Sequence, residues 1–214
     1  MSLLINCSVF LALICSVFSG VNVLGDIQND GKKLKNAVVW VEIDGHKPRR
    51  KPRLEKMTQK EKQFFPKVMV APVNTKVWFP NLDPIFHNIF SYNKVKSLDL
   101  GQYKGDGKPV VFEESGVYPI GCEIHPWMSA YIVIVNSEFF AKSNAGGKFT
   151  LKNLKSGKHT INIWSPEFKK TITREIELKD GVNNISLIVD SKEMKKKRKK
   201  RKKKKKVSSD YGSY

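Results

Sequence analysis

The spacing of apolar residues constrains the fold of this chain more than any other feature. Apolar residues recur in short alternating or continuous runs, and turn-forming stretches such as Asn81–Pro84 and Asn144–Gly147 separate them. No long segment shows the 3.6-residue period of an amphipathic helix. Many short strands joined by frequent turns predict an all-β protein of the sandwich type.

The predicted strands form two groups on either side of a boundary near Ser137–Asn144. The first group is Ala37–Ile43, Lys67–Pro72, Lys76–Phe79, Ile85–Ser91, Pro109–Phe112, Gly116–Ile120 and Tyr131–Val135. The second group is Lys148–Leu151, His159–Trp164, Thr171–Leu178 and Asn184–Val189. We therefore expect one β-domain over residues 67–137 and a second, small β-sandwich over residues 138–190.

Two polar stretches interrupt this pattern. Residues 46–66 have almost no apolar content and predict a long loop, with one helical turn near Glu55–Lys62. Residues 191–214 contain Lys195–Lys206, an unbroken run of 12 basic residues that leaves only +7 of the net charge of +19 for the rest of the chain. Such a segment cannot bury a core, so we expect a disordered basic C-terminal tail.

The first 25 residues (1–25) have an apolar centre followed by small residues, which is typical of a secretory signal peptide. Cleavage is expected near Ser19 or Gly25. The alternative is an uncleaved membrane anchor, because Leu3–Leu24 is just long enough to span a bilayer. We prefer export to the periplasm or cell envelope.

Export changes the meaning of the three cysteines. Cys7 and Cys15 lie within the signal peptide, so the mature chain keeps only Cys122. One cysteine cannot form an internal disulfide, and a bare thiol is a liability in an oxidising compartment. Cys122 is therefore expected to be buried, partnered or bound to a metal.

Cys122 lies in the segment GCEIHPWM, in which a cysteine, a histidine and a methionine stand three residues apart. Cys122 follows one predicted strand and Met128 precedes the next. The loop between them should therefore hold Cys122, His125 and Met128 at one end of a sandwich. A fourth residue, His87, lies on an alternating apolar strand and can approach this loop from the side.

The ligand types favour copper over zinc. A thiolate, two imidazoles and a weak axial thioether form the ligand set of blue-copper electron-transfer sites. Zinc prefers four strong tetrahedral ligands, and methionine is a poor one. Taken singly, Cys122, His87 and Met128 are more often ordinary core residues. Their joint order and spacing favour a metal site.

The central block resembles the cupredoxins, and the spacing of Cys122, His125 and Met128 resembles the short-loop amicyanin type. The segments that carry the resemblance are His87-Asn88, Val77–Asn81 (VWFPN), Phe112–Gly116 (FEESG), Tyr118 and Cys122–Met128. The resemblance spans about residues 68–135. It implies a Greek-key cupredoxin β-sandwich that binds one type 1 copper.

Carried over to this chain, the resemblance implies that His87, Cys122 and His125 are strong copper ligands and that Met128 is the axial one. It implies that Asn88 braces the ligand loop by hydrogen bonds. It also implies that a redox protein docks on the surface near His125 and Trp127.

The segment after the boundary resembles the transthyretin-like, carboxypeptidase-regulatory-like β-sandwich. Gly147–Leu151, Gly157–Thr160 and Ser165–Lys169 carry this resemblance, and Asp30–Val39 resembles the opening strand of such modules. The strand region 26–45 belongs either to this sandwich, with the other block inserted, or to the inserted block itself. The whole layout resembles bacterial methylamine-utilisation-like proteins with a plastocyanin domain.

These expectations lead to one preferred function and one alternative. The preferred function is a one-electron carrier, and no nucleophile–base or acid pair accompanies the site to indicate an enzyme. The alternative is a copper-binding or surface protein that contacts carbohydrate without electron transfer.

The basic run Lys195–Lys206 is expected either to contact anionic lipid or the envelope or to remain a solvated extension. Export argues against nucleic acid as its partner.

Overall fold

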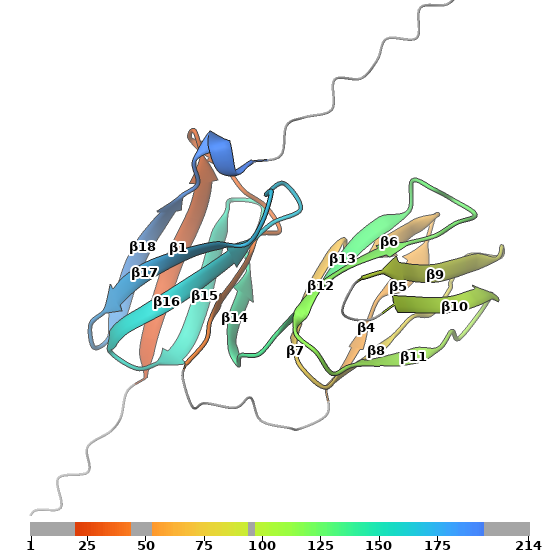
Figure 1. Cartoon of the computed structure of the whole chain (residues 1–214), viewed down its shortest axis with the longest axis horizontal. Coiled ribbons are helices and arrows are strands. Elements are labelled where there is room, and N and C mark those ends of the chain that lie inside the picture. The colour runs from red at the N-terminus through yellow and green to blue at the C-terminus, as the bar shows by residue number, and fades with distance from the viewer. Residues whose placement is uncertain (1–19, 44–52, 94–96, 195–214) are drawn as a thin grey trace, which may run out of the picture.

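The computed structural model describes residues 20–43, 53–93 and 97–194, which fold into two β-sandwiches (Figure 1). The described residues contain no α-helix, and their single helical element is a 3₁₀ turn at Ser191–Glu193. No helix in this part of the chain is long and apolar enough to cross a membrane. The all-β prediction is confirmed.

The central sandwich is built from residues 53–137. One sheet has the order β10-β9-β12-β13-β7 and the other has the order β11-β8-β4, while β5 and β6 form a separate hairpin. The strands are β4 (Leu54–Lys56), β5 (Thr58–Lys60), β6 (Gln63–Phe65), β7 (Val68–Pro72), β8 (Thr75–Trp78), β9 (His87–Tyr92), β10 (Ser97–Tyr103), β11 (Pro109–Phe112), β12 (Gly116–Gly121) and β13 (Ser129–Val135). Parallel pairing of β7 with β13 and of β4 with β8 completes a Greek-key, cupredoxin-like sandwich.

The flanking sandwich is built from residues 20–43 and 138–194. One sheet has the order β15-β1-β18, with the short β2 paired to β1, and the other has the order β14-β3-β16-β17. The strands are β1 (Val21–Asn29), β2 (Lys32–Lys33), β3 (Val38–Val41), β14 (Phe139–Lys142), β15 (Lys148–Leu154), β16 (Gly157–Trp164), β17 (Ile172–Leu178) and β18 (Val182–Ile188). Both β1 and β3 lie here, so the central sandwich is the inserted block.

The two sandwiches share a small apolar core, which explains the continuous apolar runs in β3 and β13. Alternate residues of a strand point to opposite faces, so a run that is buried throughout must be covered on both sides. In β13, Ile132 faces the core of the central sandwich, whereas Val133 packs in the shared core with Trp40 of β3 and Trp164 of β16. The Tyr131 and Trp164 rings meet edge to face, with their centroids 5.2 Å apart.

All eleven predicted strands are present, with ends that differ by up to three residues. The expected loop over residues 46–66 is wrong in its second half, and the helical turn near Glu55–Lys62 is absent. This part forms β4, β5 and β6 instead, and Met57, Gln59 and Phe64 are fully buried. The sequence did not reveal these three strands because their few buried residues stand among many lysines and glutamates. Residues 44–52 lie outside the described residues.

The structure places Val21–Gly25 in β1, where Val21 and Val23 are buried in the core of the flanking sandwich. The end of the predicted signal peptide thus overlaps a core strand. Cleavage near Gly25 would remove half of β1, whereas cleavage near Ser19 would leave the strand whole. Residues 1–19 and the basic run Lys195–Lys206 lie outside the described residues, so the signal peptide and the disordered tail stay predictions.

Candidate metal centre

Strand pairing brings the predicted ligands together at one end of the central sandwich. His87 is the first residue of β9, and Cys122 directly follows β12. Pairing of Gly121 with Phe90 places β12 beside β9. A Cβ at Gly121 would lie only 2.6 Å from the tip of the Phe90 ring, so a larger residue here would have to displace that ring.

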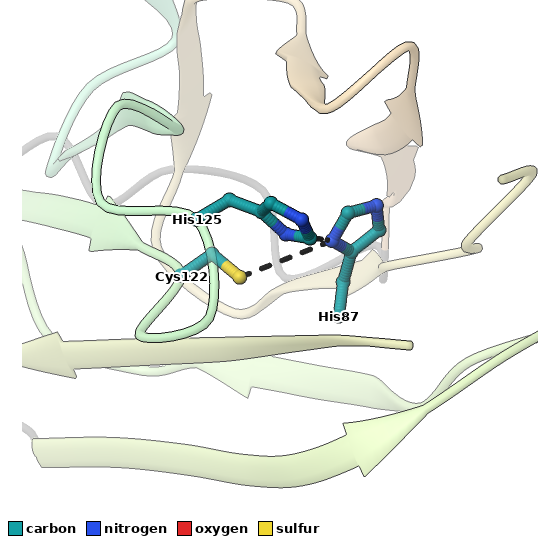
Figure 2. A group of neighbouring side chains, drawn as sticks. All are labelled: His87, Cys122 and His125. Carbon is teal, nitrogen blue, oxygen red and sulfur yellow. Dashed lines mark hydrogen bonds between the residues drawn. The ribbon is translucent and has the colours of Figure 1, made fainter. Parts of the chain in front are cut away.

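Three side chains converge at this end (Figure 2). The Cys122 sulfur and the His125 ring point from the loop after β12 toward the ring of His87 on β9. The Nδ1 atoms of His87 and His125 are 3.0 Å apart, and the Cys122 Sγ lies 3.9 Å from the His87 Nδ1. All three atoms lie within 4.8 Å of one another.

These distances fit a single metal ion. Metal–nitrogen and metal–sulfur bonds of about 2.0–2.3 Å, the values known for zinc, hold neighbouring ligand atoms roughly 3–4 Å apart. His87 is fully buried and Cys122 is 2% exposed, so these two side chains are shielded from bulk water. A thiolate with two imidazoles is a donor set that suits copper.

Asp83 fixes the orientation and tautomer of His87. Its Oδ2 lies 2.8 Å from the His87 Nε2. A carboxylate accepts hydrogen bonds, so the Nε2 atom must carry the proton and the Nδ1 lone pair faces Cys122 and His125. With this tautomer of His87, the His125 Nδ1–H donates to the His87 Nδ1, and a metal held by both rings would take the place of that proton.

Asp83 is itself held by the hairpin turn between β5 and β6. The amides of Glu61 and Lys62 donate to its Oδ1 and Oδ2 at 2.7 and 2.8 Å. Both turn residues have positive φ, at 53° and 54°. Burial raises the pKa of the Asp83 carboxyl, but these amides and the His87 ring outweigh burial, so its pKa lies below its ordinary value. The carboxylate is therefore charged at neutral pH.

His125 is the more exposed of the two histidines. Burial lowers the pKa of its imidazole, and electrostatic interactions with the His87 ring and the Lys62 ammonium group lower it further, against a smaller opposing effect of Asp83. A neutral ring keeps the lone pair that a metal requires. Trp127, which is 63% exposed, meets this ring edge to face with centroids 5.2 Å apart.

Asn88 links β9 to the ligand loop through two hydrogen bonds. Its Oδ1 accepts from the Glu123 amide at 2.8 Å, and its Nδ2 donates to the Glu123 carboxylate at 3.3 Å. The exposed Tyr92 hydroxyl donates to the other carboxylate oxygen at 3.2 Å. These bonds hold the residue after Cys122 in place and so fix the direction of the thiol.

Met128 closes the loop. It is 1% exposed and belongs to the same core cluster as Cys122. Its amide donates to the His125 carbonyl at 2.8 Å, which tightens the turn before β13. Cys122 and Met128 both line a surface depression of about 660 Å³, beside Phe90 and Tyr92. The two sulfur-containing residues thus border this depression, whereas His87 and His125 do not line it.

Sequence reasoning missed Asp83 and the Glu61–Lys62 turn. Asp83 stands four residues before His87, and this spacing was an available signal for a carboxylate that binds the far side of the ring. The turn gave no such signal, because only the fold brings it next to Asp83. The hydrogen bonds of Glu123 to Asn88 and Tyr92 were not predicted from the sequence either.

Comparison with known proteins gives structural neighbours but no sequence family. No protein-family model matches the chain, and no curated protein does. Among solved structures, similar chains include an amicyanin variant in its reduced Cu(I) form at pH 4, with 20% identity and a TM-score of 0.36. A second amicyanin variant, also described with Cu(I), has 19% identity and a TM-score of 0.36.

Both similarities cover 38% of this chain and 82% of the amicyanin. A third solved structure, of a reduced amicyanin variant, has 19% identity and a TM-score of 0.36, and here 42% of this chain and 97% of the amicyanin are covered.

Proposed function

We propose that this protein is an exported type 1 copper protein that carries single electrons. The observation that carries the proposal is the convergence of the His87 Nδ1, the Cys122 Sγ and the His125 Nδ1 in one buried cluster. Met128, buried beside Cys122, is proposed as the weak axial ligand. When bound, copper would supply one-electron exchange between its Cu(I) and Cu(II) states.

The protein supplies rigidity and protection from water. Asp83 and Asn88 hold His87 and the ligand loop from two sides, so the ligand atoms keep their spacing whichever charge the site carries. Cys122 is expected to bind as the thiolate, because a metal ligand must lose its proton. A fixed ligand set reduces the rearrangement that an electron transfer requires.

The surface around His125 is proposed as the docking face for a redox protein. Trp127 contacts the His125 ring and is well exposed, and Leu82 and Phe86, near His87 in the chain, are 62% and 52% exposed. Exposed apolar side chains of this size mark contact surfaces. A partner that docks here would approach the metal through the ring of one ligand.

We propose an electron carrier rather than an enzyme because the polar groups around the ligands all have structural partners. Asp83, Asn88 and Glu123 are each engaged in the hydrogen bonds that position the site. A second candidate, storage of copper or contact with carbohydrate, has no specific observation in its favour.

Export and contact with the envelope are part of the proposal. An intact β1 favours a cleavage near Ser19 rather than near Gly25. The basic run Lys195–Lys206 is proposed to contact anionic lipid at the envelope. Deletion of residues 195–214 should then abolish salt-sensitive binding to vesicles that contain anionic lipid, and unchanged binding would rule this contact out.

The decisive experiment is optical and electrochemical. The purified protein with Cu(II) should turn intensely blue, bleach with ascorbate and exchange electrons with a cytochrome. Cys122→Ser should remove the colour, and His125→Ala should weaken it. His159→Ala is the matched control, because His159 lies in the flanking sandwich, where its ring bonds to the Lys155 carbonyl.

The outcomes separate the candidate functions. A blue protein that cycles and exchanges electrons supports the carrier. A protein that binds copper tightly but stays redox-silent supports storage. A colourless protein, or the same loss of colour in His159→Ala as in His125→Ala, contradicts the proposed site.

A further inference from the structure

Strand β18 of the flanking sandwich has an open edge. It pairs with β1 along its whole length, and no strand pairs with its other side among the described residues. Its sequence, VNNISLI, contains no charged residue, no proline and no glycine. An unprotected edge of this kind exposes backbone donors and acceptors to any strand that approaches.

In the four described sheets of three or more strands, the other outer strands carry the usual protection. Charged residues or prolines interrupt each of them. These residues are Glu55 and Lys56 in β4, Pro72 in β7, Asp99 in β10, Pro109 in β11, Lys142 in β14, Lys148 and Lys152 in β15, and Arg174, Glu175 and Glu177 in β17. Among the outer strands of these four sheets, β18 is therefore the one that lacks such protection.

The outward-facing residues of β18 form a pattern that is complementary to itself. Val182 and Ile188 at its two ends are 61% and 68% exposed, and Asn184 and Ser186 between them are exposed too. If two copies pair antiparallel about Ile185, each Val182 faces an Ile188 and each Asn184 faces a Ser186. On this exposed face apolar residues then meet apolar ones and polar residues meet polar ones, with no like charges opposed.

We propose that two copies of this chain associate through β18, which pairs antiparallel with its symmetry mate about a two-fold axis at Ile185. The β15-β1-β18 sheets of the two copies then become one continuous sheet across the dimer. A two-fold interface uses the same patch on both subunits, which is what a self-complementary strand provides. This inference does not rest on the proposed copper function.

The position of β18 leaves the candidate metal centre free in such a dimer. β18 lies at the outer side of the flanking sandwich, and the central sandwich lies on the other side (Figure 1). The shared apolar core between the sandwiches, with Trp164 and Val133, keeps the central sandwich on that side. Each subunit could therefore meet a redox partner independently.

The positive charge of the chain opposes this association and makes the stability of the dimer depend on salt concentration. Each chain carries a net charge of +19. Two such chains repel each other over distances that salt screens to about 8 Å at physiological ionic strength. The dimer should therefore strengthen as salt rises, in contrast to an association held by ion pairs.

The test is sedimentation equilibrium of the purified chain, with its basic C-terminal run, at low and high salt. We expect a monomer–dimer equilibrium that shifts toward dimer with salt. Asn184→Lys should raise the dimer dissociation constant by about tenfold or more, because lysine on an edge strand blocks pairing. Thr150→Lys is the matched control, since Thr150 is also exposed and lies on β15 at the opposite edge of the same sheet.

A cross-linking experiment tests the register. Val182→Cys mixed with Ile188→Cys should give a disulfide-linked heterodimer, because these positions face each other in the proposed pairing and directly opposed residues lie close enough for a disulfide. Val182→Cys alone should not link to itself. Copper-loaded protein, or a Cys122→Ser background, keeps Cys122 out of the reaction.

Several results would overturn the inference. They are a monomer at every concentration and salt, a dimer that survives Asn184→Lys as well as Thr150→Lys, or a Val182→Cys chain that cross-links to itself as readily as to Ile188→Cys. A blue, redox-active monomer would reject the dimer while leaving the electron carrier intact.

Discussion

Asp83 offers the sharpest test of how the protein positions a metal. Its carboxylate accepts three hydrogen bonds, from the His87 Nε2 and from the amides of Glu61 and Lys62. In Asp83→Asn, one oxygen becomes an NH₂ group that must face a donor. The best orientation turns it toward Glu61 in the exposed turn, which keeps the bond to His87 but removes its charge.

The size of the expected loss in copper affinity follows from the kind of hydrogen bond that His87 makes in each variant. A hydrogen bond to a charged group contributes about 1.5–3 kcal/mol and a neutral one about 0.5–1.5, so Asp83→Asn should cost about 1 kcal/mol at His87, or roughly five- to tenfold in copper affinity. Asp83→Ala leaves the buried Nε2–H of His87 without a partner. That should cost about 1–3 kcal/mol, or up to about 100-fold in affinity.

The assay is a competition titration against a copper chelator of known affinity, with the blue absorption as the readout. Thermal unfolding of the metal-free variants shows whether the fold survives. Asp106→Asn removes the same charge from an exposed position and should leave the affinity unchanged. If Asp83→Ala binds copper within about twofold of the original chain, Asp83 does not position His87, and the reasoning fails.

Three further predictions concern the fold. Trp164→Ala empties a site in the shared core and should cost about 3–5 kcal/mol, with the two sandwiches unfolding in separate calorimetric steps. Gly107→Ala should destabilise the chain by about 2–4 kcal/mol in denaturant titrations, because φ is +71° and the new Cβ would lie 1.9 Å from the Phe79 carbonyl oxygen. A bond from Lys33 holds the pKa of Asp26 below its ordinary value, so Asp26 stabilises the fold above the unfolded pKa of about 3.9 and loses this effect as pH falls through the lowered value. Asp26→Asn should therefore flatten the pH dependence of stability in that acidic range, and an unchanged profile would contradict this.

The sequence could predict the strands and the ligands because both leave local signals. Alternation marks β9 and β12 whatever lies around them, and the spacing of Cys122, His125 and Met128 is a property of one loop. It could not predict β4, β5 and β6, because a segment whose fully buried residues are Met57, Gln59 and Phe64 has the composition of a polar loop.

The apolar runs in β3 and β13 show how far the sequence alone can predict the packing. Their sequence says that both faces are buried, but not by what. Tertiary structure decided that the outer faces cover each other and join the two sandwiches. It also assigned β1 and β3 to the flanking sandwich, and with them residues 26–43 of the strand region whose place the sequence left open.

The sequence by itself determined the all-β class and the set of residues able to bind copper, because strand periodicity and ligand chemistry belong to single segments. Only the tertiary structure decided which groups support those ligands. Asp83, the Glu61–Lys62 turn and His87 meet because separate strands pack at one end of a sandwich, and contacts between distant segments leave no pattern in either segment alone.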